Sequence, residues 1–365
     1  MSAKFYPLTI VSVEQLTSDA IQVQFHLPAE LMTEFSYKQG QHLTIKTDIE
    51  GVEYRRSYSL CSGVVEQELE VAIKCIKGGV FSNFAFANFT VGMTLEVMPP
   101  QGHFCTELSP DNEHDYLLIA VGSGITPIIS HIQSILAIEP KAKVTLIYGN
   151  KSAESIMFYK KLSVIHHYHK SRFQWLNVFS QQTDIAELYK GRINQQKLID
   201  LSAANVVDLA RVGDVFLCGP EAMIDELRAA FKDWQFDQQH IHSELFFSLP
   251  NRSEKSNSAH NQESQKYNET SSVTVKIDGV KTVYKVPKAG ESIIDSVMEQ
   301  GADLPFACKA GVCATCMAKL ISGKIEMDEN HVLSAEETNA GMILTCQSHP
   351  VTDEVEIDFD ADTTP

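Results

Sequence analysis

The sequence has little basic charge, few cysteines and no long apolar run. Its 365 residues include 30 Lys and Arg against 47 Asp and Glu, which gives a formal net charge of −17 at pH 7. Nucleic acids and anionic lipid surfaces bind proteins through basic faces that release counterions. The charge balance therefore argues against nucleic acid as a partner and leaves a basic protein partner open.

The apolar runs are too short for a membrane helix. Runs such as 116–121 and 144–148 fall far below the roughly 18 apolar residues that a spanning helix needs. The first ten residues lack a basic region followed by an apolar stretch and a small-residue cleavage site, which is the pattern of a secretory signal. We therefore expect no membrane span and a cytoplasmic location.

Eight cysteines in 365 residues are too sparse for a disulfide scaffold. Four of them are grouped in the last quarter of the chain, and such grouping suggests a metal site. Cys61, Cys75 and Cys105 are scattered and are expected to be small core residues. His166, His167 and His169 lie in a polar stretch and are interpreted as a solvated helix end rather than a metal site.

Two patterns of hydrophobic residues divide the first two thirds of the chain. Residues 5–105 contain short alternating runs such as 69–75, in which Glu70 and Lys74 separate apolar neighbours, and glycine or proline punctuates the runs. This pattern predicts an antiparallel β-barrel. From Asp115 onward, continuous apolar runs alternate with helix-like segments such as 125–138, which predicts a parallel sheet covered on both faces.

The chain length predicts two or three domains, and the composition supports three. Residues 249–270 are rich in Ser, Asn, Gln and Glu and almost devoid of large apolar side chains, so they cannot bury enough surface to fold. We expect a barrel domain at 1–110, an α/β domain at 111–247, a flexible linker at 248–271 and a small domain at 272–365.

The strongest motif is Cys308-x4-Cys313-x2-Cys316, which is followed by Cys346 thirty residues later. This is the ligand spacing of plant-type [2Fe–2S] ferredoxins, in which each of two irons takes two protein sulfurs. The intervening residues are small, so backbone amides can approach the sulfurs. A zinc site built on Cys313-x2-Cys316 is the alternative.

Four shorter motifs precede the cysteine cluster. They are Arg56-Ser57-Tyr58-Ser59 at the end of a strand-like run, Gly78-Gly79-Val80-Phe81-Ser82-Asn83 after the next strand, Gly122-Ser-Gly124-Ile125-Thr126-Pro127 between a strand and a helix, and Cys218-Gly219-Pro220 after another apolar strand. Taken singly, each is weak: a surface strand, a simple turn or a buried free cysteine would give the same letters. The glycine turns that precede a helix would let a diphosphate approach backbone amides.

These motifs resemble the ferredoxin–NADP reductase superfamily, and the whole chain resembles the reductase components of multicomponent oxygenases. The resemblance implies a multidomain protein with an antiparallel β-barrel flavin domain, an α/β parallel-sheet nucleotide domain and an α+β, β-grasp-like ferredoxin domain. It implies FAD, a [2Fe–2S] cluster, and NADH or NADPH as the electron donor. Electrons then pass from NAD(P)H through FAD and the cluster to a partner oxygenase or desaturase.

The resemblance also assigns site residues. Flavin contacts are expected at Arg56, Ser57, Tyr58, Ser59, Ile73, Lys74, Gly79, Val80, Phe81 and Ser82; nucleotide contacts at Gly122, Gly124, Ile125, Thr126, Pro127, Cys218, Gly219 and Pro220; iron ligands at Cys308, Cys313, Cys316 and Cys346. Ser59, Cys218 and Phe246 are the expected catalytic residues, near flavin N5, the nicotinamide C4 and the flavin ring. Ser180 is followed by Gln rather than Arg, which favours NADH slightly, although Lys151 and Arg192 could supply charge for a phosphate.

Three alternatives remain at this stage. The chain could serve a hybrid-cluster-type protein instead of an oxygenase. It could be a non-catalytic electron-transfer subunit of a larger complex, although the Gly122 and Cys218 motifs argue against an idle nicotinamide site. It could also be a self-contained reductase of small acceptors, against which the linker argues.

Overall fold

The computed structural model describes residues 4–246 and 269–361. The chain divides into two compact units, one formed by most of residues 6–246 and the other by most of the chain after residue 247. Most of the predicted linker at 248–271 lies outside the described residues. No helix within the described ranges is long and apolar enough to cross a bilayer.

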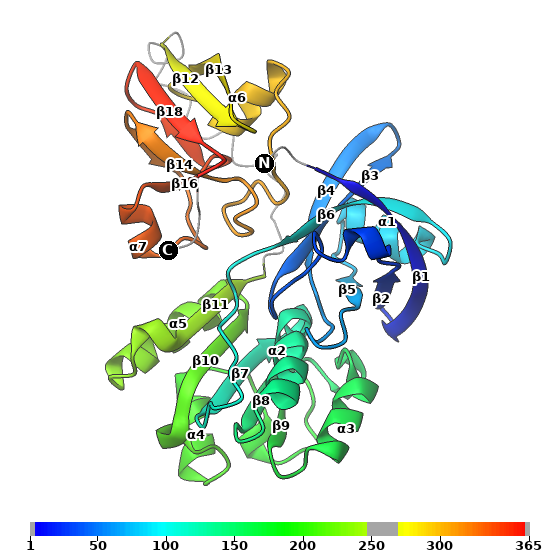
Figure 1. The fold of residues 1–365 in the computed structure, drawn as a ribbon. Helices are drawn as coiled ribbons and strands as arrows, with labels where there is room; N and C mark the ends of the chain where they lie inside the picture. The colour runs from blue at the N-terminus through cyan, green and yellow to red at the C-terminus, as the bar shows by residue number, and fades with distance from the viewer. Residues whose placement is uncertain (1–3, 247–268, 362–365) are drawn as a thin grey trace. The chain divides into compact units, whose positions relative to one another are not determined.

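The first sheet has six strands in the order β4-β3-β6-β1-β2-β5 (Figure 1). The pairings of β3 with β6, β6 with β1, β1 with β2, and β2 with β5 are antiparallel. Beyond β4, Leu60 bridges to Val71 and the Cys61 amide donates to the Glu70 carbonyl at 2.8 Å, which closes the sheet into the predicted barrel. The elements are β1 (Tyr6–Thr17), β2 (Ala20–Phe25), β3 (His42–Ile49), β4 (Val52–Ser59), β5 (Leu69–Lys74), α1 (Val80–Asn88) and β6 (Thr94–Gln101).

Strand β5 differs from its sequence pattern. Alternation predicts that Glu70 faces solvent, but the first five residues of β5 are all buried. The reason is an ion pair: Lys161 Nζ lies 2.8 Å from Glu70 Oε2 and keeps the buried carboxylate partnered. A strand whose second face is covered by another domain cannot be recognised from alternation alone.

The second sheet is parallel, as predicted, with the order β11-β10-β7-β8-β9. Apolar residues of α2 pack on one face of the sheet, and those of α4 and α5 pack on the other. The helix α2 spans the predicted residues 125–138. The elements are β7 (Asp115–Val121), α2 (Ile125–Ile138), β8 (Val144–Asn150), α3 (Tyr159–Tyr168), β9 (Phe173–Phe179), α4 (Gln195–Ala203), β10 (Val212–Gly219), α5 (Glu221–Asp233) and β11 (Ile241–Leu245).

Barrel and parallel sheet interlock within the first unit. Ser130 Oγ on α2 donates to the Ser62 carbonyl at 2.6 Å, and His131 Nε2 lies 2.9 Å from the Phe104 carbonyl oxygen. At Gly40, an added Cβ would lie only 1.8 Å from that same Phe104 oxygen. Glycine is therefore required at position 40, where the backbone of the barrel passes against the segment that leads into the second sheet.

The unit after residue 268 has its own core and its own sheet, in the order β13-β12-β18-β14-β16. Strand β12 runs parallel to β18 and antiparallel to β13, and the helix α6 packs Ile293, Ile294 and Val297 into the core. This mixed sheet with one main helix matches the α+β fold predicted for the ferredoxin domain. The elements are β12 (Thr270–Ile277), β13 (Val280–Pro287), α6 (Ile293–Glu299), β14 (Met317–Ser322), β15 (Ile325–Met327), α7 (Ala335–Asn339), β16 (Met342–Leu344), β17 (Ser348–Pro350) and β18 (Glu354–Asp358).

Candidate functional site

The first predicted flavin motif occupies the last four residues of β4. The Tyr58 ring lies 5.7 Å from the Phe81 ring, so the first residues of α1 and the end of β4 share an aromatic contact. Arg56 Nη1 donates to the Arg55 carbonyl at 2.7 Å, and Ser59 is buried. An aromatic ring with a polar tip beside a guanidinium is the side-chain set that an isoalloxazine and a phosphate would use.

The second flavin motif forms the turn that begins α1. The Gly79 amide donates to the Ile76 carbonyl at 2.8 Å, and Ser82 Oγ accepts from the Ile76 amide at 3.1 Å. Gly79 is the N-cap residue and provides no side-chain cap. The first amides of a helix lack intrahelical partners and attract anions, so this turn fits a pyrophosphate. Ile73 and Lys74 end β5, immediately before this turn.

The Gly122 motif is a turn of 3-10 helix, Gly122–Gly124, that continues directly into α2. Gly122 has a φ of +58°, in the left-handed region that favours glycine. Its carbonyl accepts a hydrogen bond of 2.9 Å from the buried hydroxyl of Tyr148 on β8. Tyr148 therefore fixes the turn, and the sequence motif gave no sign of this partner because it lies 26 residues away.

Gly124 and Cys218 are in direct contact. A Cβ at Gly124 would lie 2.3 Å from the Cys218 carbonyl oxygen and 3.2 Å from the Cys218 sulfur. The φ of Gly124 is −60°, so glycine is required here by space and not by backbone conformation. The start of α2 and the end of β10, which are separate motifs in the sequence, thus form one site at the carboxyl ends of adjacent parallel strands, where α/β sheets bind ligands.

Glu244 completes this site and was not among the predicted residues. It pairs with Cys218 in the register of β10 and β11. Ser59 Oγ, from the barrel, lies 3.4 Å from Glu244 Oε2. Burial raises the pKa of Glu244 to about 8, although the hydrogen bond from Ser59 acts against this rise. Burial and the neighbouring Glu244 charge also raise the pKa of the Cys218 thiol.

Glu244, which the sequence pattern did not single out, therefore links Ser59 and Cys218, two of the predicted catalytic residues. The available signal was the place of Glu244 within the segment 242–246, which ends the domain. The third predicted catalytic residue, Phe246, follows β11; its amide donates to the Gly219 carbonyl at 3.2 Å and its ring packs against the core that contains Cys218.

The four cysteines of the second unit pair two and two. Cys308 contacts Cys313, and Cys316 contacts Cys346. Two irons that each take two protein sulfurs require this pairing. Among the described residues, no three His, Cys, Asp or Glu side chains are grouped as ligands of one metal ion. The donor set and its pairwise arrangement fit a two-iron cluster.

Hydrogen-bond donors surround the sulfurs, as the small residues of the loop predict. The Ala310 amide donates to Cys308 Sγ at 3.3 Å. The Cys313 thiol, with the amides of Ala310, Val312 and Cys313, lowers the pKa of Cys308 to about 6 against the effect of burial. Gln347 Nε2 lies 3.6 Å from Cys346 Sγ and donates to the Lys309 carbonyl at 3.0 Å. Sequence reasoning missed Gln347, whose side chain ties the fourth cysteine to the main loop.

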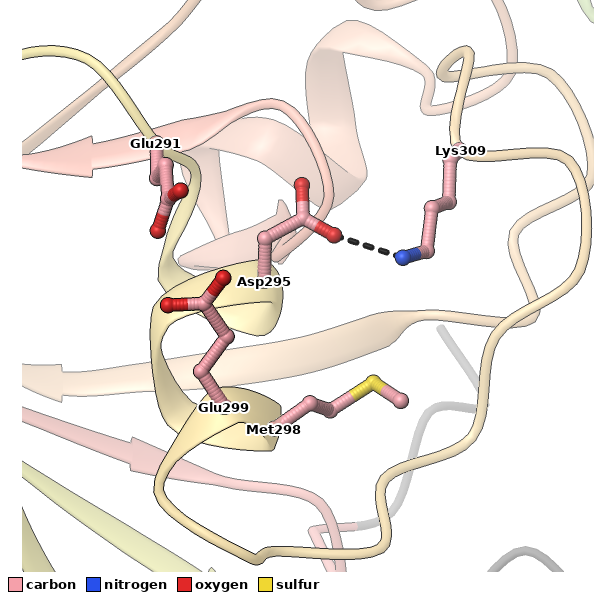
Figure 2. Close-up of a pocket in the computed structure, with 5 residues that line it drawn as sticks. All are labelled: Glu291, Asp295, Met298, Glu299 and Lys309. Carbon is pink, nitrogen blue, oxygen red and sulfur yellow. Dashed lines mark hydrogen bonds and ion pairs between the residues drawn. The ribbon is translucent and has the colours of Figure 1, made fainter.

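The loop is also anchored to α6. Lys309, next to the predicted ligand Cys308, has a φ of +53°. Its Nζ lies 2.6 Å from Asp295 Oδ1, an interaction drawn in Figure 2. Asp295 in turn accepts from Ser292 Oγ at 2.7 Å. Asp295 and Lys309 border a hollow of about 420 Å³ that Glu291, Met298 and Glu299 also line. The ion pair holds the left-handed backbone of the loop in place.

The remaining histidines and cysteines named from the sequence lie outside these sites. His166 and His167 lie in the last turn of α3, and His169 caps that helix. Cys61 is fully buried, as expected of a core residue. Cys75 and Cys105 are only half-buried, so the prediction that they are core residues is wrong for these two. Cys75 directly follows β5, and Cys105 lies between β6 and β7, so both are outside the strands and their side chains are partly exposed.

Three family models match the chain. They are "Oxidoreductase FAD-binding domain" at residues 7–105, "Oxidoreductase NAD-binding domain" at 118–229, and "2Fe-2S iron-sulfur cluster binding domain" at 275–351. The order is that of the predicted domains.

Relatives match along the full length. The chain is 41% identical to a subunit of 1,2-phenylacetyl-CoA epoxidase from Escherichia coli K12, over 98% of both chains. It is 31% identical to the ferredoxin reductase component of 3-ketosteroid-9-alpha-monooxygenase from Rhodococcus rhodochrous, over 96% of both chains. Among solved structures, phthalate dioxygenase reductase matches with a TM-score of 0.57 at 22% identity, over 97% of this chain and 98% of that one.

The three domain matches, the full-length relatives and the paired cysteines agree with one another. FAD, a [2Fe–2S] cluster and a pyridine nucleotide are the cofactors of this chain. The chain belongs to the family of NAD(P)H-dependent reductases that join an FAD-binding, an NAD-binding and a 2Fe-2S domain in one polypeptide.

Proposed function

We propose that this reductase delivers electrons to the oxygenase component of a phenylacetyl-CoA epoxidase-type system. The observation that carries the proposal is the 41% identity to a subunit of that enzyme over 98% of both chains. Identity to the ketosteroid monooxygenase reductases is lower, at 31%. Both relatives align over nearly their full length, so the difference in identity is what favours the epoxidase type.

The site geometry supports a division of labour among the chain's own residues. The FAD is held by Arg56–Ser59, Gly79–Ser82, Ile73 and Lys74. The pyridine nucleotide is bound by Gly122–Pro127 and Cys218–Pro220. The four cysteines bind two irons. When bound, FAD converts a two-electron donor into a one-electron supply.

Hydride transfer is proposed to occur beside Ser59, Cys218 and Glu244. Loss of a hydride turns the dihydronicotinamide into a cation, and an ionised Glu244 would stabilise the developing charge in a partly desolvated site. Gly124 and Cys218 are both buried, and the missing side chain at Gly124 lets the start of α2 lie directly against the end of β10. Ser59 holds the Glu244 carboxylate in place from the barrel side.

An acidic face of the ferredoxin domain is proposed to receive the acceptor. Residues 271–365 include 16 Asp and Glu against 7 Lys and Arg, a net charge of −9. Some of these carboxylates already have partners within the domain: Asp328 pairs with His349, and the Glu337 side chain caps α7 together with Ser334. Glu326 and Glu336 are therefore better candidates for docking than the paired carboxylates.

Reconstitution tests the choice of acceptor. The purified chain is mixed with phenylacetyl-CoA epoxidase from which the homologous subunit has been omitted, and NADH-dependent oxygenation of phenylacetyl-CoA is measured. A ketosteroid 9-alpha-monooxygenase that lacks its reductase component serves as the matched comparison. We expect at least a tenfold higher kcat/KM with the epoxidase, which corresponds to about 1.4 kcal/mol. Equal or lower activity with the epoxidase would overturn the proposal.

A further inference from the structure

Three histidines surround the buried carboxylate of Asp214, at the end of the parallel sheet opposite to Cys218. His114 Nε2 lies 2.7 Å from Asp214 Oδ2, while His240 Nδ1 and His242 Nε2 each lie 3.0 Å from Asp214 Oδ1. Burial raises the pKa of this carboxyl, but hydrogen bonds from His242 and His240 outweigh burial, so that the pKa is lowered. The carboxylate is thus the shared acceptor of three imidazoles.

The histidines come from three separate elements. His114 precedes β7, His240 ends a turn of 3-10 helix, Gln238–His240, and His242 is on β11. The residue before Asp214 must be glycine, because a Cβ at Gly213 would lie 2.5 Å from the His114 ring. Other titratable groups near the cluster are Tyr116, whose ring lies 4.8 Å from that of His114, and Glu139, which Asn112 links to His114. The buried His131 is also close enough to His242 to interact with its charge.

The cluster and the Cys218 site lie on one face of the sheet. Asp214, Phe216 and Cys218 alternate along β10, so their side chains share a face. Phe216 pairs with His242 and Cys218 pairs with Glu244 in the register with β11. The rings of Phe216 and His242 are stacked, with centroids 4.4 Å apart. His242 and Glu244 are two positions apart on β11, which is about 7 Å along the strand.

Strand β11 depends on these side chains for its position. It has five residues and lies at the edge of its sheet, and among the described strands it pairs only with β10. A short edge strand has few ladder hydrogen bonds, and its register is set largely by side-chain contacts. His240 and His242 attach the beginning of β11 to a fixed, buried acceptor on β10.

We propose that Asp214 is a positioning residue for hydride transfer: through His240 and His242 it fixes β11 against β10 and so holds Glu244 beside Ser59 and Cys218. The inference rests on the proposed assignment of these last three residues to the hydride-transfer site. It gives the histidine cluster a role in the reaction, although the cluster touches neither the substrate nor a cofactor.

The test is Asp214→Asn in the FAD- and iron-loaded full chain. Anaerobic reduction of FAD by saturating NADH is followed by stopped-flow absorbance between pH 5.5 and 9.5, a range that covers both the wild-type midpoint and a midpoint lowered by one unit or more. Within the described residues, Ser59 and Cys218 are the groups that face Glu244, so the wild-type rate constant should rise with pH around 8 as Glu244 ionises.

In D214N, Glu244 should move toward solvent, and the midpoint of the pH profile should fall by at least one unit toward the ordinary carboxyl value. The limiting rate constant should fall by about tenfold, with a smaller change in the KM for NADH, because the Gly122 turn is untouched. A variant that is only less stable would keep the wild-type midpoint, and that result would overturn the inference.

Two controls separate this inference from the proposed site. Glu244→Gln should abolish the pH transition near 8; if the transition persists in E244Q, the assignment of Glu244 to the site is wrong. If E244Q abolishes it and D214N leaves it unmoved, only the positioning role fails. Asp208→Asn is the matched control, since Asp208 accepts from the Ala210 amide just before β10 and does not contact β11 in the described structure.

His242 variants keep the inference testable if D214N does not fold. His242→Gln retains an N–H donor at the position of Nε2, whereas His242→Leu does not. The Leu variant should shift the pH midpoint as D214N does, and the Gln variant should restore most of the wild-type profile. Equal profiles for the two variants would show that the bond to Asp214 does not position β11.

Discussion

Replacing Gly124 with Ala should separate the two halves of the nucleotide site. The added Cβ would meet the Cys218 carbonyl oxygen at 2.3 Å and its carbonyl carbon at 2.7 Å. These are backbone atoms of a strand that is paired on both sides, so the start of α2 and the end of β10 must move apart by about 1 Å to reach ordinary contact, near 3.4 Å. Since φ at Gly124 is −60°, alanine adds no backbone strain and the effect is purely steric.

A misplacement of about 1 Å in a site that aligns two reactants can cost about 100-fold in rate, or roughly 2.7 kcal/mol. We therefore expect kcat/KM for NADH-dependent FAD reduction to fall about 100-fold in G124A, with overpacking lowering the stability by about 1–3 kcal/mol. The assay is anaerobic stopped-flow reduction, with FAD content and thermal unfolding measured on the same preparation.

The control is Gly149→Ala in the same domain. There the Cβ would meet only side-chain methyl groups of Ile193 and Val121, at 3.0 Å, which can turn aside. G149A should lose less than tenfold. Two results would refute the reasoning: a G124A rate within threefold of wild type, or an equal loss in G149A.

Three further predictions concern the carriers, the nucleotide and the acceptor. Cys313→Ser should abolish electron delivery to one-electron protein acceptors while FAD reduction by NADH continues; loss of FAD reduction as well would contradict the order of carriers. Zinc in place of about two irons in metal analysis of the wild-type chain would contradict the cluster assignment. NADH should be preferred because Gln181 and Gln182 follow Ser180, and the Gln182 side chain is already bound to the Ala153 amide; a preference for NADPH above about tenfold would reverse this expectation. Delivery to the acceptor should slow as salt rises from 0.1 to 1 M, where the Debye length shrinks from about 10 to 3 Å, whereas FAD reduction should respond much less. At low salt, Glu336→Gln should also slow delivery to the acceptor, whereas Glu337→Gln, which retains the cap of α7, should not. If acceptor reduction and FAD reduction depend on salt in the same way, the acidic residues serve solubility and not docking.

Features that depend on residues close together in the sequence could be predicted from the sequence. The spacing of Cys308, Cys313 and Cys316 is local, and it predicted a [2Fe–2S] cluster in the part of the chain that matches a 2Fe-2S domain. The helix at 125–138 and the parallel strands were predicted because a buried strand is a continuous apolar run and the helix has its own period.

Residues that act across long sequence separations could not be predicted. Tyr148 fixes the Gly122 turn from another strand, and Gln347 secures the cluster loop from beyond the fourth cysteine. Glu244 becomes part of a site only when β11 pairs with β10 and the barrel presents Ser59. Burial of Glu70 likewise depends on Lys161, ninety-one residues later, and no pattern within β5 records that partner.

The close approach at Gly40 has a consequence for building chimeric reductases. The barrel presents the main-chain oxygens of Ser62 and Phe104 to the side chains of Ser130 and His131 on α2, and a Cβ at Gly40 would also meet His131 Nε2 at 2.6 Å. Exchanging either part alone for that of a relative would place a foreign side chain against this closely packed backbone. The ferredoxin unit, by contrast, encloses its own core between β12 and β18. Recombination to change the electron acceptor should therefore cut after residue 246, so that the first two domains are transferred together as one indivisible cassette.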